Sequence, residues 1–257
     1  MSTSFDVAAS KARCLAYRRR ILEISQRVTC HVAPAFSCLE IVDVIYHGLK
    51  RPQDVFVMSK GHGALAQYVV LEQLGVLPPV ALDRFCTPEG RLGAHPDRGV
   101  AGIEASTGSL GHGLGMAVGM AYAEKLKGSD VRVYVLCSDG ELQAGSTWEA
   151  VRMAAELKLD NLMLFVDANG WGGMDQIDNA RAAERLFAFD WDAISTAGHN
   201  VEAMFNCGRS APKGQPSVVV CKTVKGRGAS FMVDRSIWHY RSPNAEEYAK
   251  ALEELRA

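Results

Sequence analysis

Four stretches of the chain are apolar from end to end, and segments with helical patterns separate them. They are "DVFVMS" (54–59), "VRVYVLCSD" (131–139), "LMLFVDAN" (162–169) and "PSVVVCKT" (216–223). Strands that are buried on both faces of a sheet show such continuous apolar runs, whereas half-exposed strands alternate. The pattern therefore predicts an α/β fold, a mostly parallel sheet with helices on both faces. Ligands of such folds bind at the carboxyl ends of the strands.

Helix-forming segments fill the spaces between these runs. We expect helices over 8–28, 38–49, 112–127, 146–158 and 180–188, one ending near Leu74, and one after Pro243, with Ser37 as the N-cap of the second. The segment 77–109 contains several prolines and glycines and is expected to be a loop. Small residues indicate that one side of the helix over 112–127 is buried against the sheet or another subunit. They are Gly115, Ala117, Gly119, Ala121 and Ala123.

The bulk composition is that of an ordinary globular protein. With 257 residues, 48% of them hydrophobic, and a net charge of −1, the chain can form one large domain over residues 1–257. The near-zero charge gives no indication of a nucleic-acid or membrane-surface partner, and no apolar run reaches the roughly 18 residues of a spanning helix. We therefore expect a cytoplasmic protein. The seven cysteines include no CxxC pair, so buried, reduced thiols are expected.

Two polar residues follow two of the predicted strands, 30 positions apart in the sequence. Asp139 ends the strand over 131–139, and Asn169 ends the strand over 162–169. Oxygen ligands of this kind suit a hard cation such as Mg²⁺ or Ca²⁺, which can hold a diphosphate next to a carboxylate that would otherwise repel it. Taken one at a time, Asp139 is also compatible with a turn or capping acid, and Asn169 with a turn residue before Gly170.

The region around these two residues resembles a signature of thiamine diphosphate enzymes. In "SDGELQAGSTWEAVRMAAELKLDNLMLFVDANG" a triplet similar to Gly-Asp-Gly is followed nearly thirty residues later by Asn. The segments "SKGHG", "GIEASTGSLGHGLGMAVGMAYAEK" and "KTVKGRG" are similar to segments of transketolases, in the same order along the chain. The resemblance to the N-terminal half of transketolase extends from about Ile24 to about Ser242. It implies a thiamine diphosphate-binding fold of the type that holds the diphosphate (PP-type).

The resemblance also implies roles for individual residues. Those implied to hold Mg²⁺ are Asp139, Asn169 and the Trp171 carbonyl, and those implied to hold thiamine diphosphate are His62, Gly108, Ser109, Leu110, Gly140, Asn169 and His239. Gly140 and His62 would contact the diphosphate, and the turn over 108–110 would hold the aminopyrimidine ring through its backbone. The implied catalytic residues are His31, His95 and His239. Imidazoles suit this chemistry because substrate hydroxyls exchange protons near neutral pH.

Three positions depart from the family pattern. Ser138 stands where the triplet usually begins with Gly, and Ala144 stands where an acid usually precedes a glycine. In the family that acid belongs to a polar network between two active sites at the dimer interface, so Ala144 puts their coupling in question. The loop over 170–176 is one residue longer than usual, which leaves open the residue that supports the thiazolium ring. Glu141 has no implied role and is expected to face solvent or an interface.

The second half of a transketolase has no counterpart in this sequence. The family's catalytic Glu, aromatic stacking partner and phosphate-binding residues lie in its pyrimidine-binding and C-terminal domains, which nothing after Ser242 resembles. The resemblance therefore implies the first subunit of a split transketolase, inactive alone and paired with a C-terminal subunit in an α2β2 assembly. Its reaction would be transfer of a two-carbon ketol unit from a ketose, expected to be phosphorylated, to an aldehyde or aldose.

Other functions remain open. A pyruvate-using reaction, acyloin-forming or similar to that of deoxyxylulose-phosphate synthase, would use the same cofactor, although the histidines favour donors with more hydroxyls. Ala144 supports a non-catalytic scaffold subunit, whereas four retained residues argue against it, namely Asp139, Asn169, His62 and His31. A dinucleotide enzyme is disfavoured, because no apolar strand leads into the glycine-rich "GSLGHGLG" (108–115). The sequence does not identify the donor and acceptor sugars or the pathway.

Overall fold

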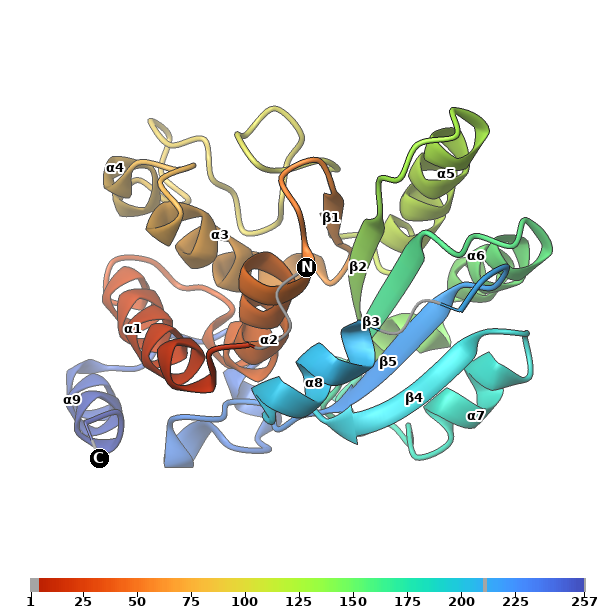
Figure 1. Cartoon of the computed structure of the whole chain (residues 1–257). Coiled ribbons are helices and arrows are strands. Elements are labelled where there is room, and N and C mark those ends of the chain that lie inside the picture. The colour runs from red at the N-terminus through yellow and green to blue at the C-terminus, as the bar shows by residue number, and fades with distance from the viewer. Residues whose placement is uncertain (1–4, 210–211, 257) are drawn as a thin grey trace.

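The computed structural model describes residues 5–209 and 212–256, which form a five-stranded sheet whose strands all pair in parallel. The strands are β1 (Val55–Met58), β2 (Val133–Ser138), β3 (Leu162–Ala168), β4 (Asp192–Ala197) and β5 (Ser217–Lys222). Their order across the sheet is β1-β2-β3-β5-β4, so β2 and β3 lie side by side (Figure 1). The predicted parallel sheet is confirmed, and four of the five strands coincide with predicted ones.

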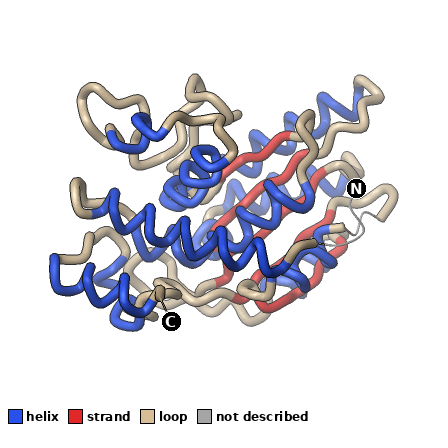
Figure 2. Tube along the Cα trace, turned by 60° about the vertical axis from the view of Figure 1, so that its left-hand side comes forward, coloured by secondary structure: helices blue, strands red, loops and turns tan. Residues whose placement is uncertain are grey.

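Helices cover both faces of the sheet, as Figure 2 shows from a second direction. Side chains alternate along β2, so Tyr134 and Leu136 enter one hydrophobic core and Val133 and Val135 enter the other. The helices of the first core are α1 (Val7–Ser25), α2 (Val32–Val44), α3 (Ala64–Gln73), α8 (Val201–Gly208) and α9 (Ala245–Glu254). Those of the second core are α5 (Gly113–Leu126), α6 (Gly145–Glu156) and α7 (Ala182–Phe187).

Shorter helical pieces join these elements. They are α4 (Pro79–Asp83), a π-helix that continues α2 (Ile45–Leu49), and 3₁₀ turns at Gly61–Gly63, Asp139–Gln143, Ser230–Met232 and Ser236–Trp238. The turns Gly61–Gly63 and Asp139–Gln143 follow β1 and β2, so they lie at the carboxyl edge of the sheet. This is the edge at which parallel α/β folds bind ligands.

Helix α2 begins six residues earlier than predicted. It starts at Val32, with His31 in the N-cap position, whereas the sequence prediction placed Ser37 there. Pro34 lies in the first turn, where its missing N–H costs little because those N–H groups have no partner within the helix. Ser37 is buried inside the helix, and its hydroxyl donates to the Asp167 carboxylate over 2.6 Å. The predicted cap is therefore wrong.

The run Val32–Leu49 also overturns the expectation about apolar length. By length and composition alone this helix of 18 residues, with a mean hydropathy of 1.3, is apolar enough to cross a membrane. In the structure 83% of it is buried inside the protein. Its acidic residues Glu40 and Asp43 pair within the fold, with Arg18 and Arg13. These are the features of a central core helix.

β4 and α8 are elements that the sequence prediction missed. β4 lies at the edge of the sheet next to β5, and its side chains are half-buried or exposed. Such a strand lacks the continuous apolar run that identified the others. Helix α8 begins after Asn200, whose side chain accepts a hydrogen bond from the Ala203 amide over 3.1 Å. An Asn before an amphipathic segment is an N-cap signal, so this helix was recognisable in the sequence.

Contrary to the prediction, the small residues of α5 are divided between two sides of the helix. Ala117 and Ala121 are buried against the sheet. Gly115, Gly119 and Ala123 are exposed, and no atom lies within 4 Å of a methyl group placed on either glycine. Positions two apart differ by about 200° around a helix, so alternate residues cannot share a face. Contact of the exposed side with another subunit stays a prediction.

The seven cysteines are all free thiols. Those that are buried are Cys14, Cys30, Cys38, Cys137 and Cys221. Burial raises the pKa of Cys30 and that of Cys38 to about 12, so these two thiols stay protonated. The prediction of buried, reduced thiols is confirmed for these five residues, whereas Cys207 is half-buried and Cys86 is exposed.

Candidate active site

Asp139 and Asn169 come together at the carboxyl edge of the sheet, as their positions after two strands predicted. β2 and β3 pair in parallel with Ser138 opposite Asp167, so both strands end at the same edge. The Gly170 amide, directly after Asn169, donates to Asp139 Oδ2 over 2.6 Å. The fold therefore unites in one site two residues that lie 30 positions apart in the sequence.

Asp139 is a buried carboxylate surrounded by neutral donors. Besides the Gly170 amide, it accepts hydrogen bonds from the Gly140 amide over 2.9 Å and from the Asn179 side chain over 2.7 Å. Burial, together with the nearby Asp167 carboxylate, raises the pKa of Asp139 to about 6 despite these bonds. A divalent cation would supply the positive charge that this carboxylate lacks.

Asn169 is turned so that its amide oxygen is available as a ligand. Its Nδ2 donates to the Asp167 carboxylate over 3.3 Å, and this bond sets the orientation of the amide. Oδ1 accepts a hydrogen bond from the Trp171 amide over 3.1 Å and keeps a second lone pair. The Trp171 carbonyl oxygen lies 3.9 Å from the point at which a side chain on Gly140 would begin. One carboxylate, one amide oxygen and one carbonyl oxygen fit a hard cation such as Mg²⁺.

A buried ion pair beside these ligands was not assigned a role from the sequence. Lys60, which follows β1, pairs with Asp167 of β3, and both side chains are inaccessible to solvent. Ser37 and Thr223 donate to the same carboxylate. Burial would raise the pKa of Asp167, but the Lys60 charge and the hydrogen bonds from Lys60, Ser37 and Thr223 together outweigh it, and the pKa is lowered. The carboxylate that orients Asn169 is therefore kept charged.

A second lysine, also without a predicted role, reaches the site from the segment "KTVKGRG". Lys225 Nζ donates to Gly173 O over 2.9 Å, lies 3.4 Å from His239 Nδ1 and stands 5.1 Å from the centre of the Trp171 ring. Burial and the Lys60 charge lower the pKa of Lys225 to about 8, so most of it is charged at neutral pH. The lysine ion pairs among the described residues do not include Lys225. Lys225 is only 2% exposed, so its ammonium is a buried positive charge without a carboxylate partner in these ion pairs.

The four predicted histidines gather around one cavity. The ring of His31 lies 5.8 Å from that of His62, 5.9 Å from that of His95 and 5.2 Å from that of His239. The cavity has a volume of about 180 Å³. The other residues of the predicted set that line it are Gly108, Leu110, Gly140 and Trp171. Of the predicted metal ligands, Trp171 lines this cavity, whereas Asp139 and Asn169 do not; Ser138 and Gly140, the neighbours of Asp139 in the chain, do.

Hydrogen bonds assign the protons on two of these rings. His31 Nδ1 lies 2.8 Å from the His239 carbonyl, and because a carbonyl only accepts, Nδ1 carries the proton and Nε2 is an acceptor. His239 Nδ1 faces the Lys225 ammonium, which only donates, so His239 carries its proton on Nε2. Burial lowers the pKa of His31, and burial with the Lys225 charge lowers that of His239 to about 4. Both rings are neutral at pH 7, and they offer one acceptor and one donor.

The turn over 108–110 is held against the end of β1 by glycines. Gly108 has a φ of +136°, a conformation that favours glycine, and a methyl group on it would come within 2.9 Å of the His95 ring. A methyl group on Gly61 would lie 2.6 Å from Gly108 Cα. Ser109 and Leu110 are exposed. The turn is therefore fixed in place while its outer side stays open to a ligand.

The expectation that Glu141 faces solvent or an interface is wrong. Its side chain is buried and closes a capping box with Ser138, whose amide donates to it over 2.8 Å. It also accepts hydrogen bonds from the Gly111 amide over 3.2 Å and from the Ser59 hydroxyl. Glu141 thereby joins the ends of β1 and β2 to the turn before α5. Its role is to hold the site together.

Fold and site together define a class of protein. At the carboxyl edge of a parallel sheet, the structure combines an oxygen set for a hard cation, a buried lysine beside it, and histidines around one cavity. This combination suits a cofactor that bears a diphosphate and whose chemistry requires proton exchange with the substrate. The chain is a diphosphate-binding α/β protein.

Comparison with known proteins identifies the family. The family model described as "Transketolase, thiamine diphosphate binding domain" matches residues 49–255. The chain is 34% identical to an apulose-4-phosphate transketolase subunit of Actinobacillus succinogenes, over 98% of this chain and 97% of the relative. It is 35% identical to the protein of the same name from Phocaeicola vulgatus, over 93% of this chain and 90% of the relative. The chain belongs to the transketolase family.

Solved structures agree with this family. The crystal structure of transketolase from Campylobacter jejuni matches with a TM-score of 0.87 and 27% identity, over 98% of this chain and 43% of that one. Our chain therefore spans about two fifths of the length of that transketolase. The resemblance inferred from the sequence, the thiamine diphosphate-binding fold and the assignment as an N-terminal transketolase chain are confirmed.

Proposed function

We propose that this chain is the diphosphate-binding subunit of a split transketolase, which transfers a two-carbon ketol unit from a phosphorylated ketose to an aldehyde or aldose. The observation that carries the proposal is the site: Asp139 and Asn169 meet at the strand ends, and Trp171, the third proposed oxygen ligand, lines the cavity of the four histidines. Two relatives that the chain matches over 90% or more of their length are named as transketolase subunits, which supports the split architecture.

The cofactor site is proposed to use Mg²⁺ as a bridge to the diphosphate. The three oxygen ligands would hold the cation, and the cation would turn a site that repels phosphate into one that attracts it. Gly140, His62 and the Lys225 ammonium would contact the diphosphate oxygens, and the backbone over 108–110 would hold the aminopyrimidine ring. Thiamine diphosphate, when bound, supplies the nucleophilic carbon that allows the C–C bond to break and form.

The histidines are proposed to move substrate protons. His31 has a free lone pair on Nε2, so it would accept the proton of a donor hydroxyl while the C–C bond breaks. His239 carries its proton on Nε2 and would donate a hydrogen bond to a substrate oxygen. His95 is exposed at the cavity, where it would contact the acceptor. Depressed pKa values keep His31 and His239 neutral, as this division of roles requires.

The relatives' names suggest the first substrate to test. Apulose 4-phosphate is the ketose phosphate in the names of both transketolase subunits compared above, so we propose a ketose phosphate of this kind as donor or product. The described residues that line the histidine cavity include no arginine and no lysine that would grip a distant sugar phosphate. We therefore propose that the partner subunit provides the phosphate-binding residues.

The partner is proposed to be a C-terminal transketolase subunit that carries the pyrimidine-binding half, in an α2β2 assembly. The exposed side of α5 and the turn before it offer an apolar surface for subunit contacts. Its large exposed residues are Leu110, Met116, Tyr122 and Leu126. Together with the exposed glycines of α5, which allow close approach of another backbone, these residues support an interface on this side.

Purification of the chain with and without its partner tests the proposal. With thiamine diphosphate and Mg²⁺, only the pair should transfer a ketol unit from a ketose phosphate to an aldehyde. Turnover by the single chain would contradict the split architecture. Use of pyruvate in place of donors with a 3-hydroxyl would favour an acyloin-forming enzyme. Calorimetry that shows no Mg²⁺-dependent binding of thiamine diphosphate to the pair would favour a scaffold subunit.

A further inference from the structure

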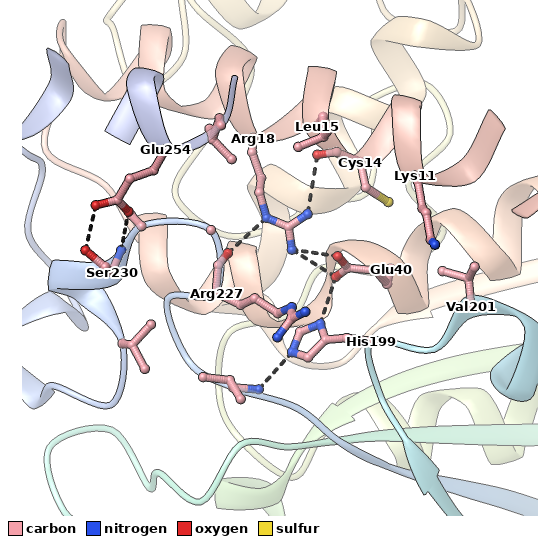
Figure 3. A pocket seen from close by; sticks show the side chains of 15 residues that line it. Lys11, Cys14, Leu15, Arg18, Glu40, His199, Val201, Arg227, Ser230 and Glu254 are labelled. Atoms are coloured by element: carbon pink, nitrogen blue, oxygen red, sulfur yellow. Dashed lines mark hydrogen bonds and ion pairs between the residues drawn. The ribbon is translucent and has the colours of Figure 1, made fainter. Parts of the chain in front are cut away.

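A buried ionic network lies next to the loop that carries Lys225 (Figure 3). Arg18 of α1 donates to both oxygens of Glu40 of α2, over 2.7 and 3.0 Å, and His199 after β4 lies 3.2 Å from the same carboxylate. Burial alone would raise the pKa of Glu40, but Arg18 and His199 lower it to about 2. The network therefore contains a permanent negative charge between two donors.

The network holds the loop over 223–228 at two points (Figure 3). His199 Nε2 accepts a hydrogen bond from the Val224 amide over 2.9 Å, so the proton of His199 is on Nδ1, where it is donated to Glu40. Arg18 Nε donates to the Arg227 carbonyl over 2.9 Å. The chain between these two anchors contains Lys225. The backbone is thus fixed on both sides of this lysine.

Lys225 connects the loop to the candidate active site. Its ammonium reaches the Gly173 carbonyl and His239, so it contacts both the loop of Trp171 and a proposed catalytic ring. The network itself stays outside the site. Arg18, Glu40 and His199 line a different cavity, of about 690 Å³, and none of them lines the histidine cavity. The network contacts two elements that lead to the site, the loop that carries Lys225 and helix α2, which begins after His31.

We propose that Arg18, Glu40 and His199 position Lys225 for the cofactor diphosphate, with His199 as the residue through which the network holds Val224. The proposal rests on the function proposed above. Arg18 and Glu40 are buried and His199 is half-buried. Well-packed apolar residues in place of a buried ion pair are often as stable or more stable, so stability alone does not explain this network. Apolar residues could also pack α1 against α2. They could not accept from the Val224 amide.

Two substitutions of His199 separate positioning from packing. His199→Phe keeps a ring of similar size but accepts no hydrogen bond, and His199→Gln restores an acceptor with a similar reach. His47→Phe is the matched control. His47 lies 3.8 Å from the buried carboxylate of Asp43, which pairs with Arg13 over 2.7 Å, in a second network of the same kind that does not contact the loop.

Hydrogen exchange and cofactor affinity are the two readouts. In the full chain without cofactor, His199→Phe should speed amide exchange of the peptide over 222–228, whereas His199→Gln and His47→Phe should stay close to wild type. In the assembled enzyme with Mg²⁺, calorimetry should show a Kd for thiamine diphosphate about tenfold higher in His199→Phe, which corresponds to one hydrogen bond. In a Lys225→Met background, His199→Phe should change the Kd less than about twofold, because the residue that it positions is absent.

The double substitution decides the proposal. An equal loss of affinity from His199→Phe with and without Lys225 would overturn it, because the network would then act on the cofactor by another route. Unchanged exchange over 222–228 in His199→Phe would overturn it as well. If the assembled wild-type enzyme bound no thiamine diphosphate, the function proposed above would fail instead. The exchange comparison, which requires no cofactor, would still support or overturn the hold of His199 on the loop.

Discussion

Replacement of Asp139 by Asn should stabilise the metal-free chain. Burial raises the pKa of Asp139 from an ordinary value of 3.8 to about 6. The charged carboxylate therefore costs about 3 kcal/mol of folding free energy at pH 7, because each pH unit corresponds to about 1.4 kcal/mol. Asn resembles the protonated acid in shape and in having a donor and an acceptor, so Asp139→Asn avoids this cost.

The gain in stability should depend on pH in one direction. Below pH 3.8, Asp139 is protonated in both the folded and the unfolded chain and contributes no difference. As the pH rises from 3.8 to about 6, the unfolded chain releases its proton first, so the folded wild type loses stability relative to the variant. The difference in the free energy of unfolding should therefore grow by about 2.5 kcal/mol between pH 4 and pH 7, from about 0.5 to about 3 kcal/mol.

Urea unfolding in EDTA, at pH 4, 5.5 and 7, measures this difference. With the partner subunit, Mg²⁺ and thiamine diphosphate, the order of stability should reverse, because ligands that bind the native wild type stabilise it and the variant lacks a proposed metal ligand. A variant no more stable than wild type at pH 7 without metal would refute the reasoning. Asp139 would then have a compensating partner, and its carboxylate would not require a cation.

Three further substitutions test the packing of the site. Lys60→Met should lower the free energy of unfolding by roughly 3–5 kcal/mol in urea titrations, because it leaves the Asp167 carboxylate buried without its cation. Adding Asp167→Asn to this variant should recover most of the lost stability. Gly61→Ala should abolish cofactor binding in calorimetry, since its methyl group would lie 2.6 Å from Gly108 Cα. Gly119→Ala, on the exposed side of α5, is the control and should stabilise the chain by about 0.5–1 kcal/mol in the same urea titrations.

The sequence predicted those strands of the sheet that are buried along nearly their whole length. β2, β3 and β5 are covered on both faces of the sheet, and their unbroken apolar runs indicate this burial in the sequence. β4 is an edge strand with exposed positions, so the same criterion could not identify it. The start of α2 was misplaced for a related reason. Ser37 was interpreted as a surface cap, whereas it is a buried donor to Asp167.

The two sets of site residues differ in how they could be predicted from the sequence. The rule that parallel strands end at one edge was sufficient to bring Asp139 and Asn169 together. The histidines come from separate loops, and no periodicity links His31 to His239. Their convergence followed only from the family resemblance, and the structure shows it as ring distances of 5–6 Å. Lys60 and Lys225 stand in segments that carried that resemblance, yet only the three-dimensional contacts show what each lysine does.

The three buried acids of the site differ in how many hydrogen bonds their oxygens accept, and this difference favours Asp139 as the proposed ligand of a cation. A carboxylate has about four acceptor positions. Glu141 accepts from Ser59, Gly111 and both the amide and the hydroxyl of Ser138, and Asp167 also has four donors, including Lys60. Asp139 accepts three hydrogen bonds, all from neutral amides, and keeps one position unused. A cation at this edge of the sheet can therefore bind Asp139 without displacing a donor, whereas at Glu141 it would have to break a bond that holds the fold, and at Asp167 it would meet the Lys60 ammonium.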